Sequence, residues 1–327
     1  MSSSILVTGG AGFIGSHLCQ KLLDRGDAVI CLDSFTDDYD PAIKHRNIEP
    51  CIQGDGFELI VGDIRDQKLL AQIARTRNID AVIHLAAKAG VRQSIRQPSI
   101  YADVNLNGTA NLLEMARDNS IDHFIFASSS SVYGERTATP FRESDPVDHP
   151  VSPYAATKKA GELLCHSFHH LHDMSISCLR FFTVYGPRQR PEMAIHLFTS
   201  LIEQGKPVPM YGDGSAERDF TYVDDIVDGV VAALARCNGY NIFNLGNHQS
   251  IRLDHLIEEI FRCCDKPISI DTLPMQAGDV SRTFACIEKA RKELGFNPGV
   301  SIREGLARFY AWYSTQKKTE HQLSTGG

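Results

Sequence analysis

A glycine-rich turn near the amino terminus constrains the fold of this chain more than any other feature. Gly9, Gly12 and Gly15 lie in the run TGGAGFIG, between a short apolar segment and a pattern typical of an amphipathic helix. Glycines at this spacing allow a tight strand-to-helix turn and a close approach of other groups to the backbone, because no Cβ stands in the way. Free N–H groups at the start of such a helix favour a bound phosphate. The chain therefore begins as a strand–turn–helix unit suited to a nucleotide.

Short β-rich runs alternate with helical patterns through the first half of the chain. The predicted strands lie in the runs ILVTGG, AVICLD, FELIVGD, DAVIHLAA, HFIFASS and ISCLRFF. The segments between them include helical patterns at 13–25, 67–77, 104–118 and 153–172, long enough for right-handed crossovers between parallel strands. The sequence thus predicts an α/β fold, with a doubly wound parallel sheet of Rossmann type in a domain spanning residues 1–182.

The alternation of predicted strands and helices becomes irregular after residue 182. Segments rich in Pro and Gly separate helical patterns, which lie at 194–203, 224–237, 253–263 and 301–313. This predicts a smaller mixed α/β lobe formed mainly by residues 183–327, with the chain free to cross between the lobes. Because ligands of open α/β sheets bind beyond the carboxyl ends of the strands, a lobe over that edge closes a cleft. The polar tail from Thr315 onward is expected to fray.

Composition excludes several classes of function. A net charge of −7 over 327 residues argues against a surface that coats nucleic acid. No apolar run approaches the roughly 18 residues of a membrane helix, so we expect a cytoplasmic protein without a membrane partner. Nine cysteines without a Cys-x-x-Cys pair favour reduced, packed thiols. His166 and His170 have metal-ligand spacing, but no third ligand follows in a recognised pattern, so no metal site is predicted.

An acidic residue after the second predicted strand indicates the cofactor. Asp33 ends that strand, where a carboxylate accepts hydrogen bonds from both adenosine ribose hydroxyls and repels a 2′-phosphate, so NAD is favoured over NADP. The residues expected to contact NAD from the glycine turn are Gly9, Gly12, Phe13, Ile14 and Gly15. Those expected farther along the same sheet edge, all of which also suit ordinary turns, are Asp63, Ile64, Leu85, Ala86, Ala87 and Lys88.

A tyrosine and a lysine lie four residues apart at the start of the helix that follows the fifth predicted strand. Tyr154 and Lys158 therefore share one helix face. A neighbouring ammonium lowers the pKa of a phenol from its usual value of about 10, which makes Tyr154 a feasible general base. The preceding strand ends in four serines, residues 128–131, and a hydroxyl there can bond the same substrate oxygen. The alternative is a solvated helix face beside a serine-rich turn.

These motifs, in order along nearly the whole chain, resemble the extended short-chain dehydrogenase/reductase superfamily of sugar-nucleotide enzymes. The segments that carry the resemblance are TGGAGFIG, LAAKAGVRQS, SSSSVYG, YAATK, RFFTVYGP, RDFTYVDDI, AGDV and KARKELGFNP. The run FTVYGPRQRPEMA most resembles the UDP-glucuronate 4-epimerases. The resemblance implies that Ser129, Tyr154 and Lys158 catalyse oxidation and then reduction at sugar C4. NAD would be regenerated within the site. Tyr154 and Lys158 would also contact the NAD.

The resemblance also implies how a uronate is held. Arg190 and Thr183 match residues that bind the C6 carboxylate, and Ser129 and Ser130 would add hydroxyl hydrogen bonds. Arg188 is a second candidate for this role, since many relatives have Trp-Gly ahead of the matching Arg; either arginine also suits a structural ion pair. Sibling dehydratases carry an Asp-Glu pair after the catalytic hydroxyl, and decarboxylases typically carry a Glu nearby. This chain has serines there, which favours epimerisation.

The remaining implied contacts concern the nucleotide and a second subunit. Arg218 matches a diphosphate-binding arginine and Asp279 a ribose-binding carboxylate, so the expected substrate is a UDP-sugar. Relatives dimerise through two helices, which here contain Leu112 and Leu163, and we expect a homodimer. The alternatives are a C4 epimerase of neutral UDP-hexoses, a sibling decarboxylase or dehydratase, and, from a different class, a catalytically idle NAD-binding regulator.

Overall fold

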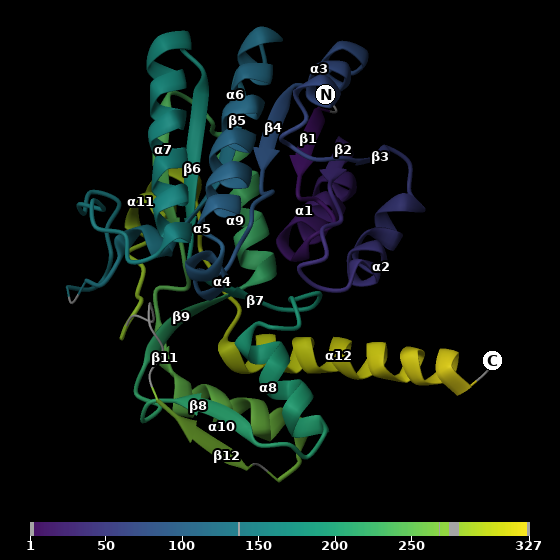
Figure 1. Ribbon diagram of the computed structural model, residues 1–327, viewed down its shortest axis with the longest axis vertical. Helices are drawn as coiled ribbons and strands as arrows, with labels where there is room; N and C mark the ends of the chain where they lie inside the picture. The colour runs from purple at the N-terminus through teal and green to yellow at the C-terminus, as the bar shows by residue number, and fades with distance from the viewer. Residues whose placement is uncertain (1–2, 137, 268, 275–280, 326–327) are drawn as a thin grey trace.

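A parallel sheet of seven strands forms the centre of the computed structural model, which describes residues 3–136, 138–267, 269–274 and 281–325 (Figure 1). The strand order is β3-β2-β1-β4-β5-β6-β10. The strands are β1 (Ser4–Thr8), β2 (Ala28–Asp33), β3 (Phe57–Val61), β4 (Ala81–His84), β5 (His123–Ser129), β6 (Ser175–Phe181) and β10 (Tyr240–Leu245). The first six lie in the runs that the sequence predicts, so the doubly wound α/β fold is confirmed.

Helices cover both faces of this sheet. One face carries α3 (Gln67–Thr76), α6 (Gly108–Asp118) and α7 (Pro153–His172). The other carries α1 (Phe13–Asp24), α9 (Val223–Ala235) and α11 (Glu288–Leu294), with α2 (Pro41–Ile52) beside α1. Short helical segments follow two of the strands. Those after β4 are α4 (Val91–Arg96), α5 (Pro98–Ala102) and η1 (Asp103–Asn107), and the one after β5 is η2 (Ser130–Tyr133). Each face therefore has its own apolar core.

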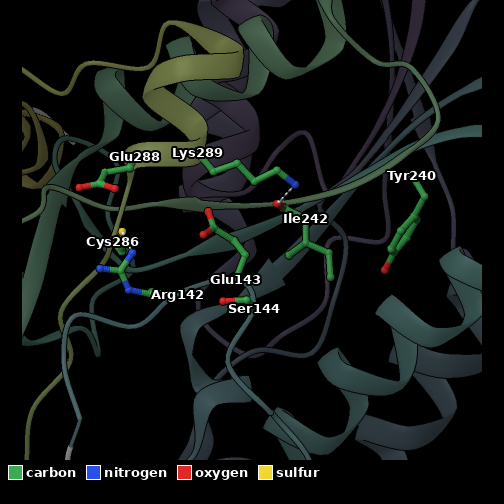
Figure 2. A pocket seen from close by; sticks show the side chains of 8 residues that line it. All are labelled: Arg142, Glu143, Ser144, Tyr240, Ile242, Cys286, Glu288 and Lys289. Atoms are coloured by element: carbon green, nitrogen blue, oxygen red, sulfur yellow. Dashed lines mark hydrogen bonds between the residues drawn. The ribbon is translucent and has the colours of Figure 1, made fainter.

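The seventh strand, β10, returns from the second half of the chain and forms an edge of the sheet. Two of its backbone groups form hydrogen bonds with charged side chains rather than with a neighbouring strand. The N–H of Asn244 donates to Glu143 Oε1 at 2.9 Å, and Lys289 Nζ donates to the carbonyl of Ile242 at 3.0 Å (Figure 2). Because these are groups that an added strand would use, the two side chains protect the edge. They line a cavity of about 540 Å³.

A second group of elements lies below the carboxyl edge of the sheet (Figure 1). Its strands are β7 (Thr183–Tyr185), β9 (Glu217–Tyr222) and β11 (Ser250–Arg252) in one sheet, and β8 (Val208–Tyr211) and β12 (Ile270–Leu273) in another. Its helices are α8 (Ala194–Glu203), α10 (Leu253–Cys264) and α12 (Ile302–Thr325). The expectation that the chain frays from Thr315 is wrong, because α12 continues to Thr325 and extends away from the body in Figure 1.

Local capping sets the position of α7. The hydroxyl of Ser152 accepts a hydrogen bond from the N–H of Ala155 at 3.1 Å, and Pro153 occupies the first helical position. Asp173 adopts a left-handed conformation after the last turn and ends the helix. These caps put Tyr154 in the first turn, facing the end of β5. All nine cysteines are free thiols. No described helix is both long and apolar enough to cross a membrane.

Candidate active site

The glycine turn makes a cradle that side chains would fill. Gly9 has a φ of +71°, and a Cβ built on it would lie 2.8 Å from the backbone nitrogen of Ala86. A Cβ on Gly15 would lie 2.2 Å from the carbonyl oxygen of Gly9. Gly12 precedes the first turn of α1, and no side chain caps that end. The helix N–H groups, including those of Phe13, thus remain available to a phosphate, and the turn fits a dinucleotide.

Asp33 lies at the end of β2 and is almost completely buried. Its carboxylate accepts hydrogen bonds from the N–H of Ala11 at 3.2 Å and of Phe35 at 2.9 Å. Lys44 Nζ, on α2, lies 3.3 Å from Asp33 Oδ1. Sequence reasoning missed this lysine because it did not predict α2, although the Asp40-Pro41 pair is a typical helix start. A cation and a carboxylate together thus occupy the expected ribose position.

The other residues predicted along this edge follow β3 and β4. They are Asp63, Ile64, Leu85, Ala86, Ala87 and Lys88. Arg65 bonds the carboxylate of Asp63 through Nε at 3.0 Å and Nη2 at 2.7 Å, and these bonds lower the pKa of Asp63. The backbone N–H of Lys88 donates to Asn105 Oδ1 at 2.8 Å, while its ammonium pairs with Asp38. Each turn is therefore held by local polar contacts that shape the edge.

The three predicted catalytic residues come together at the carboxyl end of β5. Ser129 ends that strand, and its hydroxyl lowers the pKa of the Tyr154 phenol. Lys158 lies one turn farther along α7, with Nζ 6.0 Å from the centre of the Tyr154 ring. The ammonium donates to the carbonyl of Ala127, on β5, at 2.7 Å. A phenol, a hydroxyl and a buried ammonium thus share one small region.

Burial within the protein shifts the pKa values of Tyr154 and Lys158. Burial raises the pKa of Tyr154 above its usual value, while the hydroxyl of Ser129 and the charge of Arg190 oppose the rise. Burial lowers the pKa of Lys158 to about 8. Arg190 is therefore a second cation that acts on the phenol, in addition to Lys158 on the same helix face.

A buried ion pair lies beneath the catalytic residues, and sequence reasoning missed it. Arg180, on β6, donates to Glu162, on α7, through Nε at 2.8 Å and Nη2 at 2.9 Å. Both side chains are 1% exposed. The hydroxyl of Ser128 donates to the same carboxylate at 2.6 Å. Because Ser128 precedes Ser129 and Glu162 follows Lys158 by one turn, the pair ties together the two elements that carry the catalytic groups.

The two arginines after β7 face different surroundings. The charge of Arg190 lowers the pKa of Tyr154 and acts on Tyr39 and Tyr101. Its guanidinium is 24% exposed and lies 3.3 Å from Glu192 Oε1. The positive charge of Arg190 thus acts on three phenols.

Arg188 is turned toward α1 and α2 instead. Its charge acts on His17 and on the thiol of Cys51. The residue has a φ of +63°, in the left-handed region that non-glycine residues rarely adopt. The loop therefore directs Arg190, and not Arg188, toward Tyr154.

Hydroxyl side chains surround the expected position of the sugar. Ser130 and Ser131 form the first turn of η2, and the hydroxyl of Ser129 donates to that of Ser131 at 3.1 Å. Thr183 opens β7, two residues after Phe181, which is the strand partner of Ser129. Ser130 and Thr183 are both partly exposed. The serines thus occupy the segment that immediately follows the catalytic hydroxyl.

The predicted diphosphate-binding residue belongs to the lower group of elements. Arg218 lies on β9, where its Nη1 donates to the carbonyl of Glu217 at 2.9 Å. A second arginine, Arg282, forms an ion pair with Glu217 Oε2 at 2.8 Å. The predicted ribose-binding residue, Asp279, lies outside the described residues. Two guanidinium groups therefore accompany β9 below the carboxyl edge of the main sheet.

Comparison with known proteins places these features in context. Residues 5–246 match the model of the NAD dependent epimerase/dehydratase family. A UDP-glucuronate 4-epimerase of Thermodesulfobacterium geofontis is 44% identical over 94% of this chain and 95% of that protein. The crystal structure of UDP-glucuronic acid 4-epimerase from Bacillus cereus, in complex with UDP-glucuronic acid and NAD, is 38% identical with a TM-score of 0.90, covering 96% and 99% of the two chains. UDP-glucose 4-epimerase from Thermotoga maritima, with UDP-glucose, is 31% identical with a TM-score of 0.89 and the same coverage.

Proposed function

The chain belongs to the NAD-dependent epimerase/dehydratase family, and we propose that it is a UDP-glucuronate 4-epimerase. It interconverts UDP-glucuronate and UDP-galacturonate by inverting C4 through a transient 4-keto sugar. NAD is its cofactor, as in the Bacillus cereus structures. The curated relatives of this name are 38–44% identical over nearly the full chain, whereas the neutral-sugar epimerase of Thermotoga maritima is 31% identical.

One observation carries the proposal: a hydroxyl and a guanidinium both act on the same phenol. The hydroxyl of Ser129 and the charge of Arg190 both oppose the rise in the pKa of Tyr154 that burial causes. In a hexuronate the C6 carboxylate is attached to C5, next to C4, so the 4-hydroxyl and the carboxylate are neighbours. A sugar with its 4-hydroxyl at Tyr154 therefore brings its carboxylate to Arg190. A guanidinium is well suited to bind a carboxylate through two hydrogen bonds.

The chain's own groups manage the proton of the 4-hydroxyl. Tyr154 removes that proton as general base and returns it to the same oxygen after the sugar has turned over. Ser129 hydrogen-bonds the oxygen and steadies it during both transfers. The ammonium of Lys158, on the same helix face, stabilises the phenolate form. Bound NAD, cradled by the glycine turn with Asp33 and Lys44 at the ribose, supplies the acceptor and donor of the C4 hydride.

Arg190 also protects the intermediate. A C6 carboxylate beside a 4-ketone is a β-keto acid, which readily loses carbon dioxide unless the carboxylate is held. Arg190 holds it from one side, while Thr183 and Ser130 contribute hydroxyl hydrogen bonds. Both side chains of the ion pair between Arg190 and Glu192 are partly exposed. Replacing Glu192 by the substrate carboxylate as the partner of Arg190 therefore costs little free energy. Because this chain has serines where sibling enzymes carry carboxyl acids, the 4-ketone is reduced rather than dehydrated or decarboxylated.

The division of labour between the two halves of the chain follows from this assignment. Residues 1–182 form the NAD-binding domain, and residues 183–327 mainly form the UDP-sugar-binding lobe, with β10 returning to the main sheet. Arg218 contacts the diphosphate and Asp279 the ribose. The thiols favour a cytoplasmic location, since all nine are free.

The active form in this proposal is a homodimer that pairs α6 and α7 of two copies. Leu163 and Leu171 of α7 are 56% and 69% exposed, which supports a partner on this face. Leu112, which the sequence places in the same stripe, is fully buried and belongs to the core beneath it. Size-exclusion chromatography with light scattering should give twice the chain mass, and a monomer at micromolar concentration would contradict this part of the proposal.

A charge swap at the carboxylate contact tests the assignment of substrate. Arg190→Glu is expected to abolish turnover of UDP-glucuronate, because it puts a like charge against the C6 carboxylate, while the NAD content of the purified protein stays unchanged. Glu192→Gln is the matched control. It removes the ion-pair partner of Arg190 and is expected to preserve turnover and lower KM. Full uronate turnover by Arg190→Glu would exclude the carboxylate contact and favour a neutral UDP-hexose.

A further inference from the structure

A second cavity lies behind the loop that carries Arg190. It has a volume of about 630 Å³ and is bounded by α2, α8, α12 and residues 188 and 191 of the loop. Figure 1 shows α2 above α12 on the side of the molecule toward which α12 extends. None of the residues to which we assign a catalytic or NAD-binding role lines this cavity. Its volume falls in the range of small-molecule sites.

An unsatisfied cation forms part of its wall. Arg188 lines the cavity, and its Nη1 is buried without a hydrogen-bond partner among the described residues. A buried guanidinium N–H that lacks an acceptor is energetically costly. The backbone of Arg188 is also held at a positive φ, which directs the side chain to this place at the expense of backbone strain. The guanidinium of Arg188 therefore brings to the cavity wall a positive charge that its own surroundings only partly satisfy.

The charges around the cavity favour an anion as well. Arg46 on α2 and Lys317 on α12 line it together with Arg188, whereas Glu49 is the only carboxylate among the described lining residues. Three cations against one carboxylate is an unusual local excess in a chain whose net charge is −7. Arginine pairs bind phosphate oxygens through several hydrogen bonds at once.

Aromatic side chains of α12 form another part of the wall. Trp312 and Tyr313, both on α12, line the cavity, and Trp312 is half-buried. The ring of His196 packs edge-on against both, with centroid separations of 5.8 Å and 5.5 Å. Nδ1 of the same histidine is hydrogen-bonded to the carbonyl of Gln189, in the loop, at 2.7 Å. A partly open indole fixed by its neighbours offers a flat surface on which a base can stack.

We propose that this cavity binds a nucleotide, with its phosphate on Arg188 and Arg46 and its base against Trp312. The occupant lies against the back of the segment that positions Arg190, on the opposite side from Tyr154. The inference does not depend on the reaction, because a nucleotide site here would stand whichever sugar the catalytic residues accept.

The chain contains a single tryptophan, Trp312, and it lines this cavity, so its fluorescence can report binding there. The NAD-loaded, full-length protein is titrated with UMP, with inorganic phosphate and with uridine, and the emission of Trp312 is recorded. We expect saturable quenching by UMP, binding at least tenfold weaker for phosphate, and no saturable change with uridine. Equal affinities for phosphate and UMP would contradict stacking of the base. The absence of saturable quenching by UMP would overturn the proposal.

Variants separate this cavity from the catalytic cleft. The double variant Arg46→Gln, Lys317→Gln is expected to weaken the UMP response more than tenfold. Lys318→Gln, which removes one positive charge at the next, exposed position of α12, is expected to leave it unchanged. Arg218→Gln removes the proposed diphosphate contact of the cleft and is also expected to leave the response unchanged. Quenching that survives the double variant but is lost in Arg218→Gln would assign the signal to the catalytic cleft and refute the proposed site.

Discussion

Substitution of Arg180 by methionine is expected to destabilise the protein strongly. Arg180 donates two hydrogen bonds to the carboxylate of Glu162, and both side chains are 1% exposed. The variant leaves that carboxylate buried, with the hydroxyl of Ser128 at 2.6 Å and the ammonium of Lys159 at 3.7 Å as its remaining polar neighbours. Methionine fills much of the volume of the arginine stem, so the change chiefly removes the charge.

The expected size follows from general magnitudes. Removing one partner of a buried ion pair costs about 3–5 kcal/mol, because the other charge stays buried without compensation. An unfolding entropy of about 2.1 cal/mol/K per residue amounts to roughly 0.7 kcal/mol/K for a chain of 327 residues. The ratio predicts a fall in apparent Tm of about 4–7 °C. Loss of order at the end of β5 should also reduce kcat, since Ser128 adjoins Ser129.

Differential scanning calorimetry at one scan rate measures the shift. Lys159→Met is the matched control, because it removes the weaker contact with Glu162. The side chain of Lys159 is 22% exposed, so this variant should lower the free energy of unfolding by less than about 1 kcal/mol. The double variant Arg180→Met, Glu162→Leu should recover part of the loss, since no buried charge remains. An Arg180→Met protein that melts within 1 °C of the wild type would refute this reasoning.

Three further predictions concern the catalytic group, the cofactor cradle and a buried histidine. Tyr154→Phe should lower C4 epimerisation, followed by NMR, by about 10²–10⁴-fold while NAD stays bound, because proton transfer is lost; full turnover would contradict the role of the phenol. Gly15→Val should yield protein without NAD by chromatography of denatured extracts, because a Cβ would lie 2.2 Å from the Gly9 carbonyl oxygen; a normal NAD content would show that the turn relaxes. Burial lowers the pKa of His84 to about 3. Below about pH 6.5 the imidazole therefore binds a proton in the unfolded chain but not in the folded protein. The free energy of unfolding should thus rise from pH 5 to pH 7, by up to about 1.4 kcal/mol per pH unit from this residue. His84→Gln should show a smaller rise in Tm over that interval, and an unchanged rise would exclude His84 as a source.

The main sheet was predictable from the sequence because its first six strands are short apolar runs between helical patterns. The seventh was not, because β10 follows a helix of the second half, and its run YNIFNL carries no sign that it returns to β6 rather than joining a local sheet. Helix α2 was missed for a different reason. Its apolar periodicity is weak and Pro50 lies within it, so only the Asp40-Pro41 cap indicates where it begins.

The candidate site divides in the same way. Tyr154 and Lys158 lie within one turn of one helix, so spacing alone predicted that they share a face. The pair of Arg180 and Glu162 joins β6 to α7, and such a contact depends on how the two elements pack. The different directions of Arg188 and Arg190 depend on the positive φ of Arg188, which no local sequence rule predicts for an arginine.

Product analysis tests the central claim most directly. The NAD-loaded protein is incubated with UDP-glucuronate and, separately, with UDP-glucose, and the sugar protons are followed by NMR. The account predicts that UDP-galacturonate appears from the first substrate and that the second is unchanged. Formation of UDP-galactose from UDP-glucose, with UDP-glucuronate left intact or converted to a pentose, would contradict it.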